Sequence, residues 1–360
     1  MSRSAGSDLL SPGVLAEAVT WRRDLHRHPE LGYHEQRTGD FIAAQLSAWG
    51  LRVHRGLAGT GVVGTLTRGT SRRSVGIRAD MDALPMQEHS GVLHASHTTG
   101  VMHGCGHDGH VAMALAAARV CVALPSLDGT VRFIFQPAEE IEGGARRMVE
   151  EGLFRLFPCD SVYALHNWPA LPLGTCVARD GPALAAVGTF EITVTGRGCH
   201  GALPHEGTDA LLAGCELVTA LPSIASRDID PRQTAILSAT QIQAGDTWNI
   251  IPDRCLIRGT TRWFDDDVGA VLERRIKELS YAIAAAFRCS AEVHYQRRGP
   301  ATLNNPRAAG FVREVAAAPP LKLEVVDTPP STGAEDFAFM LKVKRGAYVF
   351  IGNGDGTHRV

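Results

Sequence analysis

The sequence lacks an apolar stretch long enough to cross a lipid bilayer, which needs about 18 consecutive apolar residues. Its longest candidate, HVAMALAAARVCVALP at residues 110–125, is shorter and rich in alanine, so it predicts a buried helix. The first residues, MSRSAGSDLLSPGVLAEAV, contain no apolar core of the kind that a secretory signal peptide needs. We therefore expect no membrane span and no signal peptide.

An excess of either charge is also absent. The formal net charge is −2 over 360 residues, so no strong field attracts nucleic acid or an anionic membrane surface. The sequence has no C-x-x-C pair, because its eight cysteines are spread along the chain and several lie in apolar runs. Such cysteines are typical of reduced thiols, which predicts a cytoplasmic protein.

Repeats and low-complexity segments are missing as well. The hydrophobic content of 44% is that of a globular protein, and 360 residues suffice for one large or two ordinary domains. Residues 74–80, 130–136 and 160–166 have the pattern of buried strands, and residues 107–124 and 143–152 have the pattern of helices. This alternation predicts an α/β fold with a mostly parallel sheet.

A second pattern begins near residue 184. Strands are predicted at residues 188–196, 234–243, 254–264 and 290–296, with helices at 208–225 and 266–287. The order β-α-β-β-α-β is that of a ferredoxin-like unit. The first pattern then resumes with a helix at 304–317, a strand at 321–326, a helix at 333–341 and a strand at 346–352. We therefore predict a catalytic domain of residues 1–183 and 300–360, interrupted by an inserted ferredoxin-like α+β domain of residues 184–299.

Residues able to bind a metal gather where the predicted strands of the first domain end. In chain order they are Asp80 and Asp82, then Cys105 and His107 in a glycine-rich loop, then Glu139 and Glu140, then His166. Ligands of open parallel sheets bind beyond the carboxyl ends of the strands. The placement predicts a metal site, in which one glutamate coordinates and its neighbour takes a proton from water. The sequence offers more candidate ligands than one tetrahedral ion needs, and a site with two metal ions would explain them.

The segment VMHGCGHDGH, residues 101–110, allows two other interpretations. It could be a polar loop with only a structural role, although polar groups this dense need partners when buried. It could instead hold a nucleophilic Cys105 with His107 as its base. The acidic neighbours would raise the pKa of that thiol, whereas a bound cation would hold it as a thiolate. We therefore favour a metal site, with Asp108 and His110 orienting the loop or starting the next helix.

Ten segments, in order from about residue 20 to 358, resemble the M20 metallopeptidase superfamily. They are LHRHPELGYHEQRT, IRADMDALP, MHGCGHDGH, PAEE, GGARRMVEEG, LHNWP, GCHGALPH, NIIPD, GTTRWF and GAEDFAFM. The resemblance is to the amidohydrolase branch, which includes hippurate hydrolases, N-acyl-amino-acid amidohydrolases and auxin-conjugate hydrolases. It implies a catalytic α/β domain with a binuclear metal centre and an inserted ferredoxin-like lid domain that mediates dimerisation.

The resemblance also implies roles for individual residues. The metal ligands would be Cys105, His107, Glu140, His166 and His358, binding two divalent ions of Mn, Zn, Co or Ni. Glu139 matches the general base, and His200 matches a histidine that stabilises the oxyanion in the active site of the other subunit. Asn249, Arg262 and Gly333 match positions near the substrate. Asp80 matches a position where other branches of the superfamily place a metal-ligating histidine, and here it would only orient a ligand.

These implications predict a metal-dependent amidohydrolase that cleaves N-acetyl or N-benzoyl amino acids and forms a homodimer or a dimer-based tetramer. One alternative is a dipeptidase of the same superfamily. Another is a catalytically weakened metal-binding homologue. This last alternative rests on His358, which is followed only by Arg359 and Val360, whereas the family usually has an H-x-P segment and a tail there.

Overall fold

The computed structural model describes residues 11–141 and 143–355, which fold into two compact units. The larger unit comprises residues 1–183, 302–329 and 335–360, and the smaller unit comprises residues 184–301 and 330–334. Residues 330–334 join the smaller unit because Ser331 pairs with Leu184 and the carbonyl of Gly333 accepts the N–H of Ala185. None of the described helices is both long and apolar enough to cross a membrane.

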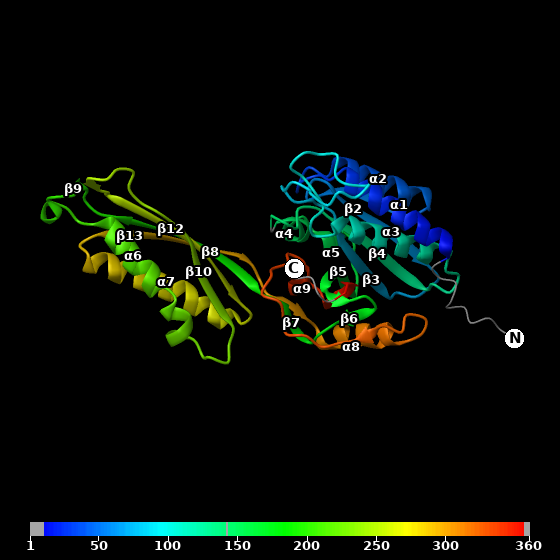
Figure 1. Ribbon diagram of the computed structural model, residues 1–360. Coiled ribbons are helices and arrows are strands. Elements are labelled where there is room, and N and C mark those ends of the chain that lie inside the picture. The colour runs from blue at the N-terminus through cyan, green and yellow to red at the C-terminus, as the bar shows by residue number, and fades with distance from the viewer. Residues whose placement is uncertain (1–10, 142, 356–360) are drawn as a thin grey trace. The chain divides into compact units, whose positions relative to one another are not determined.

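An eight-stranded mixed sheet forms the centre of the larger unit (Figure 1). Its strands are, in sheet order, β1 (Arg52–Leu57), β2 (Gly61–Arg68), β4 (Gly129–Gln136), β3 (Ser74–Asp80), β5 (Ser161–Pro172), β16 (Gly346–Gly354), β6 (Thr175–Val177) and β15 (Glu324–Val325). The four central strands, β4-β3-β5-β16, are mutually parallel. The predicted α/β class with a large, mostly parallel sheet is therefore confirmed.

Helices cover this sheet because each buries an apolar face. The helices of the larger unit are α1 (Pro12–Arg27), α2 (Gln36–Ala48), α3 (His107–Ala123), α4 (Gly144–Glu150), α5 (Leu153–Leu156), α8 (Pro306–Ala317) and α9 (Ala338–Val343). Leu25 of α1, Ile42 of α2 and Leu115 of α3 share one core cluster with Phe133 of β4. Ala309 of α8 belongs to a separate cluster with strands β6 and β16.

The predicted elements of this unit mostly form where expected, with three differences. The strand predicted at 160–166 continues to Pro172 because it stays paired with β16, so His166 lies inside β5 rather than at its end. The helix predicted at 333–341 begins only at Ala338, since Glu335 accepts the N–H of Phe337 in a turn. The strand predicted at 321–326 is reduced to the two residues of β15.

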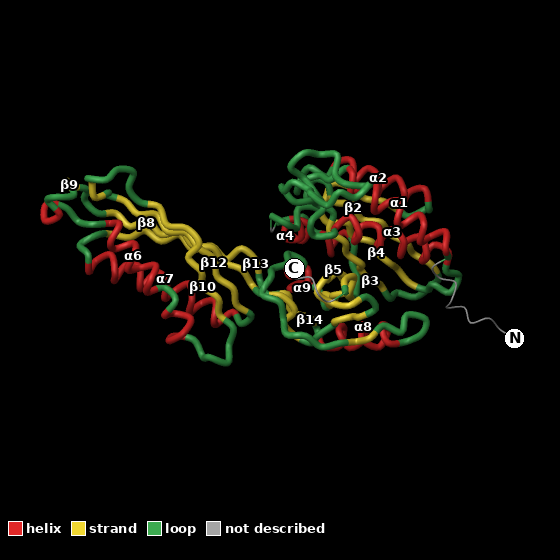
Figure 2. The backbone as a smooth tube through the Cα atoms, in the orientation of Figure 1, coloured by secondary structure: helices red, strands yellow, loops and turns green. Residues whose placement is uncertain are grey.

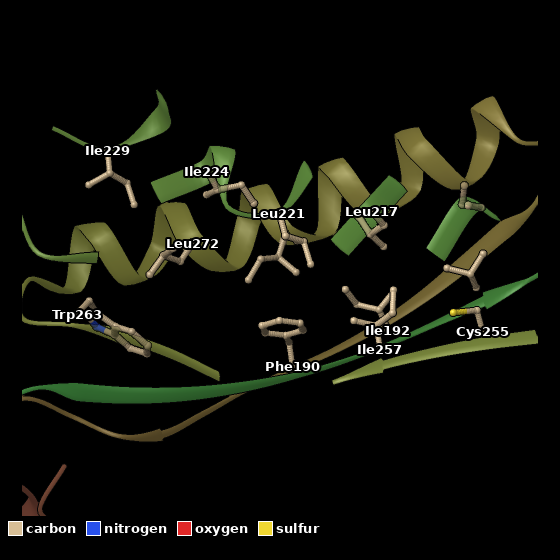
Figure 3. Close-up of a cluster of buried hydrophobic side chains, with 14 of the residues drawn as sticks. Phe190, Ile192, Leu217, Leu221, Ile224, Ile229, Cys255, Ile257, Trp263 and Leu272 are labelled. Carbon is tan, nitrogen blue, oxygen red and sulfur yellow. The ribbon is translucent and has the colours of Figure 1, made fainter. Parts of the chain in front are cut away.

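The smaller unit has the predicted β-α-β-β-α-β order, and Figure 2 shows its strands as one layer with the helices on one side. Its elements are β8 (Ala186–Thr195), α6 (Ala210–Ala220), β10 (Ala235–Gln243), β12 (Arg254–Trp263), α7 (Asp266–Ala286) and β13 (Ser290–Gly299). The sheet order is β10-β12-β8-β13, and all three pairs are antiparallel. Figure 3 shows Phe190, Ile257 and Trp263 facing Leu217, Leu221 and Leu272, which form its core.

Short elements complete the two units. They are β7 (Gly181–Leu184) paired with β14 (Thr302–Asn304), β9 (Cys199–His200) paired with β11 (Ile250–Ile251), η1 (Pro204–Glu206) and η2 (Ile224–Asp228). The antiparallel pair of β9 and β11 places His200 opposite Ile250.

Candidate metal centre

Neighbouring strands bring the predicted metal ligands to one edge of the sheet. Strand β3 lies between β4 and β5 and is parallel to both (Figure 1), so the carboxyl ends of β3 and β4 lie level with His166 in the middle of β5. Asp80 is the last residue of β3 and is paired in register with Gln136, the last residue of β4. Glu139 and Glu140 follow three and four residues later. The register thus explains why carboxylates from separate segments converge.

Cys105, His107 and His166 form one side of the site. The Sγ atom of Cys105 lies 3.4 Å from Nε2 of His166. His107 is the first residue of α3, and the preceding Gly106 has a left-handed φ of 89°. The Nδ1 atom of His166 donates to the carbonyl of Asn167 at 2.7 Å, which leaves Nε2 as the nitrogen able to bind a metal. One ligand atom from each of these three residues lies within 4.8 Å of the ligand atoms of the other two.

The two glutamates lie on the other side of His107. Nε2 of His107 is 3.8 Å from Oε1 of Glu140, and Nδ1 of His107 is 3.3 Å from Oδ1 of Asp82. Asp82 also accepts the N–H of Glu140 at 3.0 Å, so it ties the glutamate backbone to the histidine. Glu139 is buried beside them, and its Oε1 atom accepts the N–H of Asp336 at 3.4 Å.

The chemistry of these side chains fits divalent metal ions. Nε2 of His107 and Oε1 of Glu140 are buried and make no hydrogen bond to any part of the chain that the structure describes, whereas Nδ1 of His107 has only the ion-pair contact with Asp82. Buried polar atoms without partners are costly, and coordination to a cation would satisfy them. Thiolate, imidazole and carboxylate together are a donor set for zinc and its transition-metal neighbours.

Burial and charge shift the pKa values of the site in opposite directions. Burial and the charges of Glu335 and Asp336 raise the pKa of Glu139 well above its usual range. Burial lowers the pKa of His166 to about 3, helped by the charge of His110, so this ring is neutral and can act as a ligand. Burial also raises the pKa of the Cys105 thiol. An active thiolate without a bound cation is therefore disfavoured, as the sequence suggested.

A buried guanidinium that the sequence prediction missed lies beneath the carboxylates. Arg78 of β3 is 2% exposed and contacts Asp80 at 2.7 Å, Glu335 at 2.8 Å and Asp336 at 3.3 Å. It also donates to Gln136 at 2.7 Å. The signal in the sequence was an arginine within an otherwise apolar strand, since a buried charge must have partners.

His110 and Asp108, which were predicted to orient the loop or to start the next helix, both bind groups on neighbouring elements. His110 is bound through Nδ1 to Asp80 at 2.6 Å and through Nε2 to Asn167 at 2.7 Å, which fixes the start of α3 against β3 and β5. Asp108 binds His26 at 2.7 Å and Arg22 at 2.7 Å, so it attaches the same turn to helix α1.

The remaining predicted residues lie elsewhere. His200 and Asn249 are neighbours in the smaller unit, because His200 pairs with Ile250 and the carbonyl of Asn249 accepts the N–H of Gly201 at 2.7 Å. Arg262 lies near the C-terminal end of β12, where its guanidinium donates to the hydroxyl of Thr260 and to the carbonyl of Thr261. Gly333 lies in an exposed turn beside Ala185. His358 falls outside the described residues.

Known proteins resemble the chain over nearly its whole length. The N-acetyl-L-cysteine deacetylase of Bacillus subtilis (strain 168) is 40% identical over 94% of this chain and 80% of the deacetylase. The hippurate hydrolase of Campylobacter jejuni is 37% identical over 92% of this chain and 87% of its own length. A crystal structure described as a dinuclear metal binding peptidase from the M20 family, also from Bacillus subtilis, is 32% identical with a TM-score of 0.84, and covers 95% of this chain and 90% of that one.

The family itself is also matched directly. Residues 76–360, which contain every ligand position discussed above, match the peptidase family M20/M25/M40. This match and the extended similarity agree with the motifs that the sequence carries, so the chain belongs to the peptidase family M20/M25/M40.

Proposed function

We propose that this chain is a metal-dependent amidohydrolase that cleaves the amide bond of N-acyl amino acids and releases a carboxylic acid and a free amino acid. The observation that carries the proposal is the pair Glu139–Glu140, in which one carboxylate lies beside His107 and the other is buried next to it without binding that histidine. The similar deacetylase and hippurate hydrolase support an acetyl or benzoyl group on the substrate.

The ligands of the proposed binuclear centre are Cys105, His107, Glu140 and His166, with His358 as a further ligand outside the described residues. The donor set suits Mn, Zn, Co or Ni. When bound, two such ions would polarise the scissile carbonyl and lower the pKa of water. The chain itself contributes the fixed positions of the ligands, because Asp82 and Asn167 hold the backbone and rings in place.

Glu139 is the proposed general base. Its carboxylate would take a proton from the attacking water and later deliver it to the nitrogen of the leaving amino acid. The environment suits this exchange because burial and two acidic neighbours favour the protonated form of Glu139. A carboxylate whose pKa is raised is a stronger base than an ordinary glutamate, and it keeps the proton taken from water until the leaving amine accepts it.

His200 is the proposed donor to the oxyanion of the tetrahedral intermediate. Its Nδ1 atom accepts the N–H of Ala202 at 3.1 Å, so Nε2 carries the proton and can donate it in a hydrogen bond. We propose that it serves the active site of the partner subunit in a homodimer assembled through the smaller unit. Asn249, Arg262 and Gly333 are proposed substrate contacts, and Arg262 suits the carboxylate of the amino acid.

The proposal predicts the result of replacing Glu139→Gln. Turnover of N-acetyl and N-benzoyl amino acids should fall by at least about 100-fold, while the metal content per subunit stays unchanged. Rates are measured after chelation and again after Mn, Co or Zn is added. Near-normal turnover in this variant would contradict the assignment of the base. Faster cleavage of a dipeptide with a free amine than of the matching N-acetyl amino acid would favour a dipeptidase instead.

A further inference from the structure

The backbone turns in an unusual way directly before the two catalytic-site glutamates. Ala138 has a left-handed φ of 55° and is fully buried, although residues with a side chain seldom adopt this conformation. The turn separates the two glutamates, so that Glu139 reaches the N–H of Asp336 whereas Glu140 reaches His107. A strained conformation of this kind persists only where its surroundings hold it.

The buried carboxylate of Glu35 holds this turn from the other side. Glu35 is fully buried at the start of α2, and its Oε1 atom accepts the N–H of Ala138 at 2.9 Å. Its Oε2 atom accepts the hydroxyl of Thr60 at 2.6 Å. Both oxygens are thus bound by groups from separate segments, which fixes the carboxylate in one orientation.

The chain around Ala138 is packed too closely for the turn to move freely. A Cβ atom at Gly32 would lie 3.1 Å from the Cα and Cβ atoms of Ala138, so the segment before α2 lies directly against it. The carbonyl of Ala138 accepts the N–H of Gly144 at 3.2 Å, where α4 begins. Both backbone polar groups of Ala138 are therefore hydrogen-bonded. The carbonyl is bound by the backbone of Gly144, whereas the N–H is bound by the side chain of Glu35.

We propose that Glu35 is a positioning residue for the reaction: by binding the N–H of Ala138, it keeps Ala138 left-handed and so directs the carboxylate of Glu139 at the reacting water. This inference rests on the proposed function, in which Glu139 is the base. Glu35 itself touches neither substrate nor metal in this proposal. It acts through one peptide group, 103 residues away in sequence.

The first test compares Glu35→Ala with Glu35→Gln. Loss of the acceptor in Glu35→Ala should lower kcat by about 10- to 100-fold, because small misplacements of a reacting group have effects of this size. KM and the metal content should change little, because the N–H of Glu140 donates to Asp82 and this bond does not involve Glu35. Glu35→Gln keeps an acceptor for Ala138 and can donate to Thr60, so its kcat should stay within about 3-fold of the wild type.

The chain offers a control in Asp128. Its Oδ1 atom accepts the N–H groups of Thr70 and Ser71 at 2.8 Å, next to Gly69, which has a left-handed φ of 65°. Asp128→Ala removes the carboxylate that supports this turn, which follows β2 and carries no residue of the site. We expect a lower melting temperature but a kcat within about 2-fold of the wild type, since the reacting geometry is kept. An equal loss of kcat in Asp128→Ala and Glu35→Ala would overturn the proposal.

A rescue experiment separates positioning from general support of the fold. Glycine adopts a left-handed φ without strain, so Ala138→Gly in the Glu35→Ala background should restore part of the lost kcat. No recovery in a folded double variant would contradict the proposal. If Glu35→Ala does not fold, Thr60→Val provides the same comparison, because it frees one oxygen of Glu35 and should lower kcat without changing KM.

The outcome for Glu139→Gln distinguishes the two proposals. If Glu139→Gln keeps its turnover, the proposed base is wrong and the positioning role fails with it. If Glu139→Gln is inactive but Glu35→Ala has the kcat of the wild type, the proposed function stands and only the role of Glu35 is overturned.

Discussion

At the scale of single residues, Arg78 provides the positive charge that allows the carboxylates of Asp80, Glu335 and Asp336 to be buried together in the folded protein. Burial alone would raise the pKa of Asp80, but the charges of Arg78 and His107 hold it well below its usual range. Asp80 can therefore stay ionised and bind His110, which in turn fixes Asn167. One cation thus supports the orientation of groups on β3, α3 and β5.

Replacing Arg78→Met should destabilise the protein by about 3–5 kcal/mol at neutral pH, because it leaves buried carboxylates without their counter-charge. The depressed pKa of Asp80 contributes stability above the pKa of the unfolded chain, and that stability is lost as the pH falls. The deficit of the variant should therefore hold steady at higher pH and shrink only as the pH falls below about 4, the pKa of an unfolded aspartate.

Urea unfolding of both proteins at several pH values measures this deficit. The control is Arg146→Met, since Arg146 forms an exposed pair with Glu150 at 2.8 Å and both side chains are more than half exposed. Such pairs contribute less than about 1 kcal/mol. Similar losses in both variants, or a deficit that does not depend on pH, would contradict the role assigned to Arg78.

At the scale of elements, the sequence predicts best where burial dictates a continuous apolar run. The strands at 74–80 and 130–136 and the helix at 107–124 agree with β3, β4 and α3 to within a residue. The metal-site prediction depended on these three elements, because each ends or begins at a polar group. The proximity of Cys105, His107, Glu140 and His166 could be inferred for that reason.

Prediction fails where contacts distant in sequence override the local pattern. The segment before Phe337 has a helical pattern, yet Glu335 and Asp336 bind Arg78, which lies 257 and 258 residues earlier. Likewise, β5 continues past His166 because β16 pairs with it, and nothing local to residues 160–166 indicates that pairing. Neither contact has a signature within a short window of sequence.

The turn that starts α3 allows a test at this scale. Gly106 has a φ of 89°, and a Cβ atom there would lie 2.2 Å from Oδ1 of Asn167. Gly106→Ala should therefore cost more than about 2 kcal/mol of unfolding free energy and reduce the bound metal, since His107 is the next residue.

The matched control is Gly109→Ala, three residues further along. A Cβ atom at Gly109 meets no atom within 4 Å, and the residue lies inside α3. Alanine is favoured over glycine in a helix by about 1 kcal/mol, so this variant should be as stable as the wild type or slightly more stable. If Gly106→Ala is as stable as Gly109→Ala, the left-handed turn is not needed to place His107.

At the scale of the whole molecule, the proposed reaction needs residues from both units. The larger unit holds the proposed base and ligands, and the smaller unit holds His200 and Asn249 on the β9–β11 pair. Each unit has its own apolar core, so each can present its groups on a firm scaffold. Whether His200 serves its own subunit or a partner is a question about assembly, which a sequence pattern does not encode.

Mixing two inactive variants answers that question. If His200 acts in the partner's site, a heterodimer of His200→Ala and Glu139→Gln contains one complete site, formed by Glu139 of the first subunit and His200 of the second. Random exchange of equal amounts makes half of the dimers mixed, so activity should recover to roughly a quarter of the wild type in a closed twofold dimer. If His200 acts within its own subunit, no mixed dimer has a complete site and the mixture stays inactive. Hydrolysis of an N-acetyl amino acid after co-refolding measures the recovery. A co-refolded mixture of His200→Ala with wild type should keep about half of the wild-type activity in either case, so it controls for the yield of refolding.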